Sequence, residues 1–349
     1  MLVSVDTEEK AIKLAQDVAF VHSQGGFEIC NWTSNSQGVL KALQMINTTD
    51  KNLDHSPEIA TEKVLGMWWR TEADVFTFKV GWDRYDRDLL EGHRRPTKRE
   101  VLRVLMTIFD PLGLIAPFLA YLKILLQEVW RSGIQWDDKI DDNILTKWRT
   151  WLRVLPEVEQ VQIPRCFRSN FTNGYEDVQL HTFVDASENA MAAACYTRFV
   201  QNGVVRCSLV AAKTRVAPLR YHTIPRLECE SAVIGVRLAR SVVDSLSFPV
   251  DKLFYHTDSR DVICWLGSDH RRYSSFIASR VSEILEATEV HQWRWVPTKL
   301  NVADDATKWE KSPDMTPSSR WYNGPDFLRL PEETWGEKAK PTPNFVRAC

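Results

Sequence analysis

The strongest constraint on the fold is the Asn202-Gly203 pair, which separates two apolar runs at residues 192–200 and 204–211. Asn-Gly between two such runs is the strongest short-range signal for a β-hairpin. A further strand at 178–184 precedes the hairpin, and a helix is predicted over about 225–246. Strand 252–256, helices 259–267 and 273–287, strand 291–297 and a helical stretch at 301–309 follow. This order predicts an α/β (α+β) domain with a mixed five-stranded sheet and helices.

The first half of the chain shows a different pattern. Strands are predicted at 1–5 and 27–32, a helix at 8–22 capped by Thr7, and a hairpin-like region at 63–69 and 75–80. The Thr97 to Glu100 capping box opens a helix over 101–109, and helices follow at 118–131 and 140–155. Trp148 and Trp151 are three residues apart, the spacing of neighbours on one helix face, and are predicted to lie in the core. A boundary is predicted within 164–177. The tail after Glu310 is rich in Pro and Ser and is predicted to be loosely packed.

Composition narrows the class of protein. The 349 residues suffice for two or three domains, and the net charge of −2 argues against an overall polyanion-binding surface while leaving room for a local basic patch. The 7 cysteines show no C-x-x-C spacing, which favours a reducing compartment over disulfides or a zinc site. The acidic N-terminus is no signal peptide, and the apolar stretch at 111–122 is too short to cross a bilayer. We therefore expect an intracellular, cytoplasmic protein that is neither secreted nor membrane-bound.

Four acidic residues lie at the ends of predicted elements: Asp185 and Asp258 where strands end, Glu228 early in a helix, and Asp304 at the start of the last helix. In-line hydrolysis of a phosphodiester needs an activated water and a stabilised leaving oxygen, which two Mg²⁺ ions can supply together. Mg²⁺ prefers carboxylate oxygens. A stripe of small residues, Ala232, Gly235 and Ala239, lies below Glu228 and would let its helix approach the sheet.

Each acid taken singly is better explained as a helix cap or strand end, where Asp and Glu are common. The four together, in this order of elements, favour a metal site. Asp305 competes with Asp304 for the fourth position, and Glu230 competes more weakly with Glu228.

These residues resemble the pol polyprotein of BEL/Pao-type LTR retrotransposons over nearly the whole chain. The most specific segment is Asp110-Pro111-Leu112-Gly113. The other matching segments are residues 22–27, 32–36, 65–69, 97–109, 135–138 and 321–328. The resemblance implies a C-terminal remnant of a reverse-transcriptase palm and thumb at 1–90 and a mainly helical connection region at 91–165. It also implies a ribonuclease H-like domain at 178–310 and a tail at 311–349 that resembles the spacer before integrase.

By this resemblance, Asp185 would bridge two Mg²⁺ ions, with Mn²⁺ as an alternative. Glu228 and Asp258 would hold one ion and Asp304 the other. The substrate would be the RNA strand of an RNA–DNA hybrid, which proteins recognise through its shape, backbone and 2′-OH groups. Other parts of a pol polyprotein would be partners.

Several departures from the family pattern limit the expected activity. The stretch before Asp304, residues 296–299, lacks the His that assists product release in many ribonucleases H, and Lys299 is a partial substitute. The paired-Asp motif of the polymerase is absent, so we expect no polymerase activity. Related families carry an aspartic-peptidase label, but Asp6-Thr7-Glu8 and Asp258-Ser259-Arg260 lack the required Gly. No His/Cys module of an integrase is present in the sequence.

Basic residues provide candidate nucleic-acid contacts. They are Arg94, Arg95, Lys98, Arg99, Arg271, Arg272 and Lys299. For the cluster from Arg94 to Arg99, a solvated loop and helix start is an equally good explanation, and for Arg271 and Arg272 an exposed loop is the better one.

The sequence thus supports two main hypotheses. The first is an Mg²⁺-dependent ribonuclease H-like endonuclease attached to a reverse-transcriptase remnant. The second is a catalytically silent or domesticated nucleic-acid-binding remnant of a retrotransposon. An aspartic peptidase is a third hypothesis, and the sequence supports it least.

Overall fold

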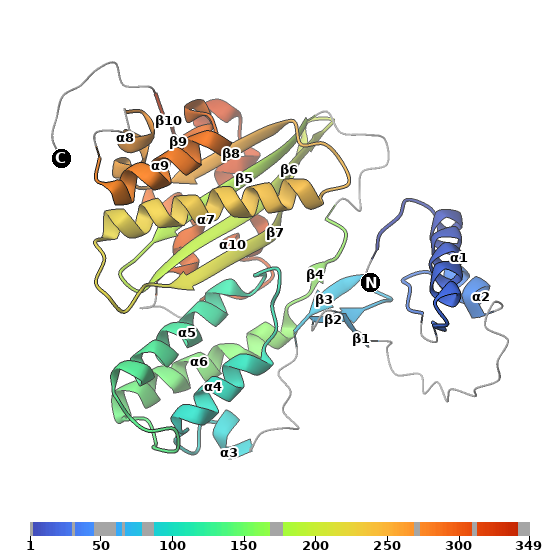
Figure 1. Ribbon diagram of the computed structural model, residues 1–349, viewed down its shortest axis with the longest axis horizontal. Helices are drawn as coiled ribbons and strands as arrows, with labels where there is room; N and C mark the ends of the chain where they lie inside the picture. Colours follow the sequence, from blue (N-terminus) through green and yellow to red (C-terminus); the bar gives the residue numbers. More distant parts are fainter. Residues whose placement is uncertain are drawn as a thin grey trace. The chain divides into compact units, whose positions relative to one another are not determined.

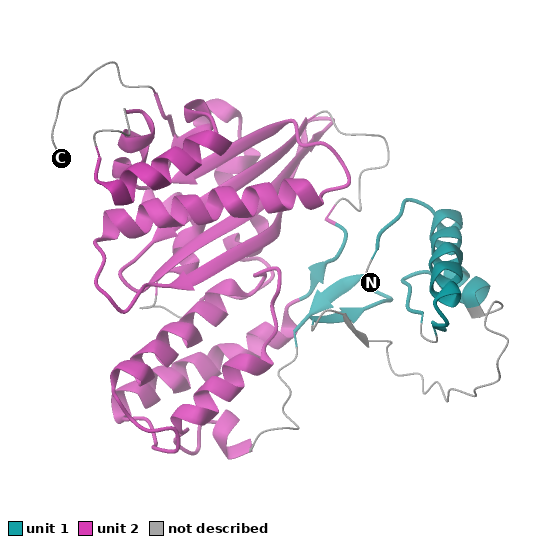
Figure 2. Cartoon of the chain, in the orientation of Figure 1, with its two compact units in different colours: residues 1–79, 162–166 teal, residues 80–161, 167–349 magenta. Residues whose placement is uncertain are grey.

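The computed structural model describes residues 3–29, 32–44, 61–64, 67–78, 87–167, 177–268, 273–308 and 313–340. The chain divides into two compact units (Figure 2). Unit 1 comprises Met1–Lys79 and Gln162–Cys166, and unit 2 comprises Val80–Val161 and Phe167–Cys349. In this division, the helical region and the C-terminal sheet belong to the same unit. Among the described helices, none combines the length and apolar character needed to span a bilayer.

Unit 1 holds two helices and a small antiparallel sheet. The helices are α1 (Glu8–Gln24), capped by Thr7 as predicted, and α2 (Gln37–Gln44). The strands β1 (Thr61–Val64), β2 (Met67–Arg70), β3 (Val75–Thr77) and β4 (Ile163–Pro164) lie in that order in the sheet. The strands predicted at 1–5 and 27–32 are absent from the described residues of those segments. The side chains of Val3, Val5 and Phe27 are exposed, so they lack the packing that stabilises a strand.

Unit 2 begins with a helical region: α3 (Arg87–Leu90), α4 (Lys98–Thr107), α5 (Ala116–Arg131) and α6 (Asp142–Gln160). The predicted capping box is present, with Thr97 and Glu100 each accepting from the other's backbone N–H. Trp148 and Trp151 are fully buried, as predicted, and Trp151 stacks on Phe118 with ring centroids 4.7 Å apart. This aromatic cluster holds α5 against α6.

A six-stranded mixed sheet forms the centre of unit 2 (Figure 1). Its strands are β5 (Asp177–Ala186), β6 (Ala190–Gln201), β7 (Val204–Val216), β8 (Lys252–Thr257), β9 (Trp293–Trp295) and β10 (Glu337–Lys338), in the order β10-β9-β8-β5-β6-β7. Strands β5, β6 and β7 form an antiparallel meander, while β8 runs parallel to β5 and β9 parallel to β8. The predicted α/β class and the Asn202-Gly203 hairpin are confirmed, and both turn residues have positive φ.

Helix α7 (Ile224–Ser245) crosses one face of this sheet, with α8 (Arg260–Leu266) and α9 (Ser275–Ala287) beside it (Figure 1). The small-residue stripe has the expected effect. A Cβ on Gly235 would lie 2.3 Å from Val184 Cγ1, and Ala232 and Ala239 are buried. The helix therefore approaches β5 more closely than a bulkier sequence would allow.

Two predictions about the C-terminal region are wrong. The sheet has six strands rather than five, because β10 pairs with β9. The pattern at 301–309 predicts a helix, but the described residues 301–308 contain only the short 3₁₀ helix Val302–Ala306, and Trp309 lies outside the described residues.

The tail is also packed rather than loose over residues 313–340. It forms α10 (Arg320–Asn323) and two 3₁₀ helices, Asp326–Arg329 and Glu332–Thr334. Trp321, Leu328 and Trp335 are buried, and the Trp321 indole N–H donates to the Leu114 carbonyl. Pro and Ser are common in such tails, but here large apolar anchors interrupt them and bury enough surface to order the segment.

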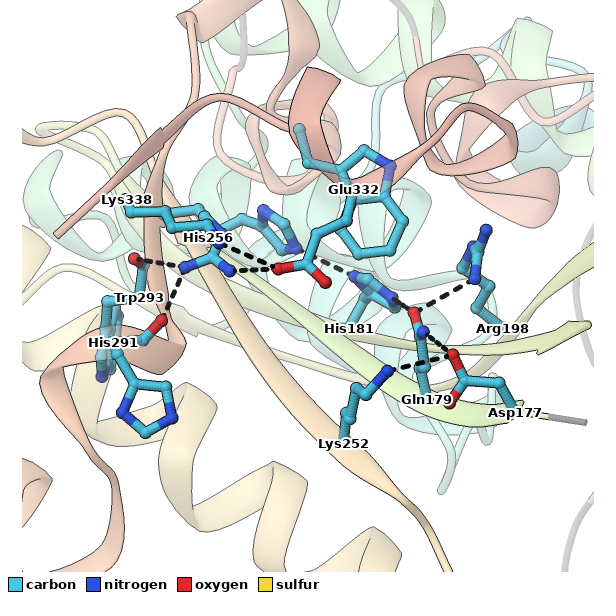
Figure 3. A network of polar contacts seen from close by, with 12 residues as sticks. Asp177, Gln179, His181, Arg198, Lys252, His256, His291, Trp293, Glu332 and Lys338 are labelled. Atoms are coloured by element: carbon cyan, nitrogen blue, oxygen red, sulfur yellow. Dashed lines mark hydrogen bonds and ion pairs between the residues drawn. The ribbon is translucent and has the colours of Figure 1, made fainter.

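A buried polar network joins this tail to the sheet (Figure 3). Arg294 on β9 forms an ion pair with Glu332 in the tail, with an Nη2 to Oε1 distance of 2.9 Å. On the neighbouring strands, the His181 and His256 rings are joined by a 3.0 Å nitrogen–nitrogen hydrogen bond. Burial lowers the pKa of both histidines, that of His256 to about 3, so they are neutral at pH 7.

The loop between α4 and α5 attaches the helical region to the outer strand of the sheet. The Asp110 carboxylate accepts from the backbone N–H groups of Leu114 and Ile115, both at 2.8 Å. The Leu112 carbonyl in turn accepts from Ala212 N–H on β7, at 2.7 Å. The segment Asp110-Pro111-Leu112-Gly113 thus satisfies backbone groups on the edge strand β7.

Candidate active site

Asp185 and Asp258 become neighbours through strand pairing. Strands β5 and β8 are adjacent and parallel, and their last paired residues are Val184 and Thr257. The two acids follow directly at the carboxyl ends of these strands. Both therefore stand at the same edge of the sheet, where ligands commonly bind in open α/β sheets.

Glu228 and Asp304 reach this edge from two other elements. Glu228 lies one turn into α7, where Ser259 Oγ donates to its Oε2 at 2.6 Å. Asp304 belongs to the 3₁₀ helix that packs against β5 and β6. Buried Asn301, the N-cap of that helix, donates from Nδ2 to Asp258 Oδ1 at 3.0 Å and to the Val184 carbonyl at 2.9 Å. Asn301 therefore links the 3₁₀ helix, β5 and the residue after β8.

Each of the four carboxylates is oriented by a neighbouring donor. In addition to Ser259 and Asn301, Thr307 Oγ1 donates to Asp185 Oδ2, and Lys308 Nζ lies 2.6 Å from Asp304 Oδ2. The supporting roles of Ser259, Asn301, Thr307 and Lys308 were not predicted from the sequence. The available signal was their position, because each lies within a few residues of a candidate acid in the sequence.

Burial and mutual repulsion dominate the electrostatics of the cluster. Burial first, and then the Asp258 carboxylate, raise the pKa of Asp185 to about 7, although the Thr307 hydrogen bond opposes this rise. Burial also raises the pKa of Glu228 and of Asp304, and the nearby Asp258 adds to both effects. The cluster is therefore a site of confined negative charge, which a divalent cation would relieve.

The structure distinguishes the acids of the cluster from their sequence neighbours. Asp305 forms a two-pronged ion pair with Arg320, with 2.8 Å between Arg320 Nε and Asp305 Oδ2. Glu230 forms an ion pair with Arg280. Both neighbours are thus engaged with arginines, which favours Asp304 over Asp305 and Glu228 over Glu230.

The four carboxylates are not gathered as tightly as the ligands of one ion. Among the described residues, Asp88, Glu91 and His93 are the one group of three whose ligand atoms all lie within 4.8 Å of one another, and that group is exposed. The carboxylates of the four acids repel one another when they are ionised. Their donor chemistry nevertheless fits Mg²⁺, because all four are hard oxygen ligands and each carboxylate has a second oxygen to offer.

The basic residues predicted to contact nucleic acid are mostly engaged within the protein. Arg94, Arg95 and Arg99 form ion pairs with Glu100, Asp142 and Asp137.

Lys98 is buried, donates to the Ile134 carbonyl at 3.0 Å and lies over the Trp130 ring. Lys299 is exposed near the site, but Lys308 rather than Lys299 contacts Asp304. Arg271 and Arg272 lie outside the described residues.

Comparison with known proteins agrees with the fold. Residues 97–259 match the model of the Pao retrotransposon-like RNaseH-like domain. Over these residues the chain is similar to an RNase H-like domain of the Pao retrotransposon type. The match includes Asp185, Glu228 and Asp258, together with the helices α4 to α6. It stops before Asp304, and the reverse-transcriptase part of the resemblance lies outside it. No curated protein matches the chain.

Two solved structures are similar to part of this chain. One is the amino-terminal RNase H domain of Rv2228c from Mycobacterium tuberculosis, solved as a fusion with maltose-binding protein. It is 15% identical, has a TM-score of 0.25, and the match covers 37% of this chain and 94% of that one. The other is RNase H1 from the halophilic archaeon Halobacterium salinarum NRC-1. It is 17% identical, has a TM-score of 0.25, and the match covers 37% of this chain and 96% of that one.

We predict that the Lys308→Gln variant binds Mg²⁺ more tightly than the wild type at pH 8. The Lys308 ammonium lies against Asp304 and would repel an incoming cation, but it is largely exposed, so we expect a gain of roughly threefold to tenfold. Titration calorimetry would measure the change, with Lys299→Gln as a control for the loss of one charge. Equal affinities of the Lys308 variant and this control would contradict the prediction.

Proposed function

We propose that this chain is an Mg²⁺-dependent endonuclease that hydrolyses the RNA strand of RNA–DNA hybrids. The observation that carries the proposal is the pairing of β5 with β8, which brings Asp185 and Asp258 together at one sheet edge. Glu228 and Asp304 reach the same edge and interact electrostatically with Asp258. The match of residues 97–259 to a retrotransposon RNase H-like domain supports the choice of substrate.

In this proposal, Asp185 and Asp258 would provide the central metal ligands, with Glu228 and Asp304 on either side. When bound, two Mg²⁺ ions would supply an activated water and charge stabilisation for the leaving oxygen. The chain's own residues do the positioning. Asn301, Ser259 and Thr307 hold the carboxylates in fixed orientations, which limits the reorganisation needed to receive ions and substrate.

The decisive experiment is a cleavage assay with a labelled RNA–DNA hybrid and Mg²⁺. We expect cleavage within the RNA strand by the wild type and none above background by Asp258→Asn. Asp244→Asn removes an exposed carboxylate far along α7 and should cleave as the wild type does. If the wild type cleaves no better than Asp258→Asn, the endonuclease proposal fails and the nucleic-acid-binding remnant is the remaining reading.

A further inference from the structure

One segment next to the acidic cluster has the opposite charge. Residues 204–227 contain five Lys and Arg, one His and no Asp or Glu, in a chain whose net charge is −2. The segment comprises β7, the connection to α7 and the first turn of α7, and it ends directly before Glu228. Such a one-sided charge distribution is a local polyanion-binding signature that the average composition hides.

Three of the five cations of this segment are available to a ligand. Lys213, Arg215 and Arg220 are exposed and, among the described residues, none of the three forms an ion pair or a side-chain hydrogen bond. Lys213 and Arg215 alternate along β7 and so project from the same face of this edge strand. In contrast, Arg94, Arg95 and Arg99 in the helical region are already paired with carboxylates.

Exposed apolar side chains accompany these cations. Tyr221 is 83% exposed and Leu219 is 67% exposed, on either side of Arg220. The bases of a duplex are already stacked on one another, so an exposed aromatic ring beside a cation can instead pack against a backbone sugar and its 2′-OH.

The connection between β7 and α7 is anchored at both ends beside the candidate active site. Ala217 donates its N–H to the Asn189 carbonyl at 2.8 Å, and Asn189 belongs to the turn that follows Asp185. Gln127 on α5 donates to the Ala217 carbonyl at 2.7 Å. At the other end, Thr223 is the N-cap of α7, which carries Glu228. The exposed residues 218–221 therefore lie between elements that present two of the four acids.

We propose that Lys213, Arg215, Arg220 and Tyr221, here named the basic ledge, form a nucleic-acid-binding surface that holds the substrate against the acidic cluster. The three cations contact backbone phosphates and the Tyr221 ring packs against a backbone sugar. The ledge offsets the repulsion that four carboxylates exert on a polyanion. This inference rests on the proposed function, since it names the surface that binds the same substrate.

Fluorescence anisotropy of a labelled RNA–DNA hybrid, in Ca²⁺ to prevent turnover, tests the ledge. The triple variant Lys213→Gln/Arg215→Gln/Arg220→Gln should raise the Kd roughly 10-fold to 100-fold near 0.15 M salt. It should also reduce the slope of log K against log salt by about 2. Tyr221→Ala removes no charge and should weaken binding about fivefold with little change in that slope.

The matched control is Arg131→Gln/Lys139→Gln/Arg153→Gln, which removes the same charge from exposed positions of the helical region. An equal loss of hybrid affinity in both triple variants would contradict the proposal for the basic ledge. Unchanged hybrid binding by the ledge variant would also contradict it, and would point to an acidic protein partner instead. Wild-type cleavage of the hybrid reports the proposed function separately. If the wild type cleaves the hybrid but the ledge variant binds it normally, only the proposal for the basic ledge is wrong. If the wild type neither binds nor cleaves, both proposals fall.

Discussion

Replacing Asp185 with Asn is expected to abolish hybrid cleavage and, in the same protein, to stabilise the metal-free fold at pH 8. Cleavage should fall at least about a thousandfold, because Asp185 is placed centrally among the proposed metal ligands. The stability gain follows from burial. Asp185 is 7% exposed and faces the Asp258 carboxylate, so its ionised form is disfavoured in the folded protein.

The pH dependence of this gain has a defined sign. The folded-state pKa of Asp185 is raised from 3.8 to about 7. The folded protein therefore retains a proton that the unfolded chain releases between these values. The contribution to stability is complete below pH 3.8 and is lost as the pH rises through 7. At pH 8 without divalent ions, Asn should raise the free energy of unfolding by roughly 2–4 kcal/mol, and at pH 5 the gain should be much smaller.

Urea unfolding in EDTA at pH 8 and pH 5 measures both effects. Asp305→Asn is the control, because it changes an acid of the neighbouring 3₁₀ helix Val302–Ala306 but leaves Arg320 without its ion-pair partner. This control should lose stability at both pH values. A loss of stability in Asp185→Asn at pH 8 similar to that of Asp305→Asn would show that Asp185 is an ordinary structural residue. Added Mg²⁺ should stabilise the wild type and have a smaller effect on Asp185→Asn.

Gly113→Ala is expected to cost about 3 kcal/mol or more of folding free energy. Gly113 has φ of +73°, and a Cβ built there would lie 1.9 Å from the Ala212 carbonyl oxygen. The clash is with the backbone of β7, which cannot move aside as a flexible side chain could. Ala would also be strained at this φ. The change should therefore loosen the contact between the α4–α5 loop and the edge of the sheet.

Gly133→Ala separates the two causes. Gly133 has nearly the same φ, +72°, but nothing lies within 4 Å of its added Cβ, so only the backbone strain of about 1 kcal/mol applies. Urea unfolding of both variants at pH 7 gives the comparison. Equal costs at the two positions would contradict a close approach between Gly113 and β7.

Local pattern was sufficient to predict five of the six strands of the sheet. The Asn202-Gly203 turn, the strand ending near Asp185 and the Thr97 capping box all depend on short-range stereochemistry, which a sequence displays directly. The acids could be selected because each lies at the end of an element, although their supporting residues could not.

Sequence pattern failed where order depends on distant partners. Residues 313–340 look like a linker in composition, yet Trp321 and Trp335 are buried and β10 completes the sheet. Conversely, the alternation at 1–5 predicts a strand, but Val3 and Val5 are exposed. Whether an apolar residue is buried depends on what packs against it, and this information is not local.

The sequence by itself determined the order of strands and helices and which acids stand at their ends. Only the tertiary structure decided that Asp304 and Glu228, rather than Asp305 and Glu230, face Asp258, because arginines far along the chain engage the other two. It also decided which cations remain exposed and unpaired, because an ion pair forms between side chains that folding brings together. The sequence specifies the sign of each side-chain charge, but the fold determines which other side chain it pairs with.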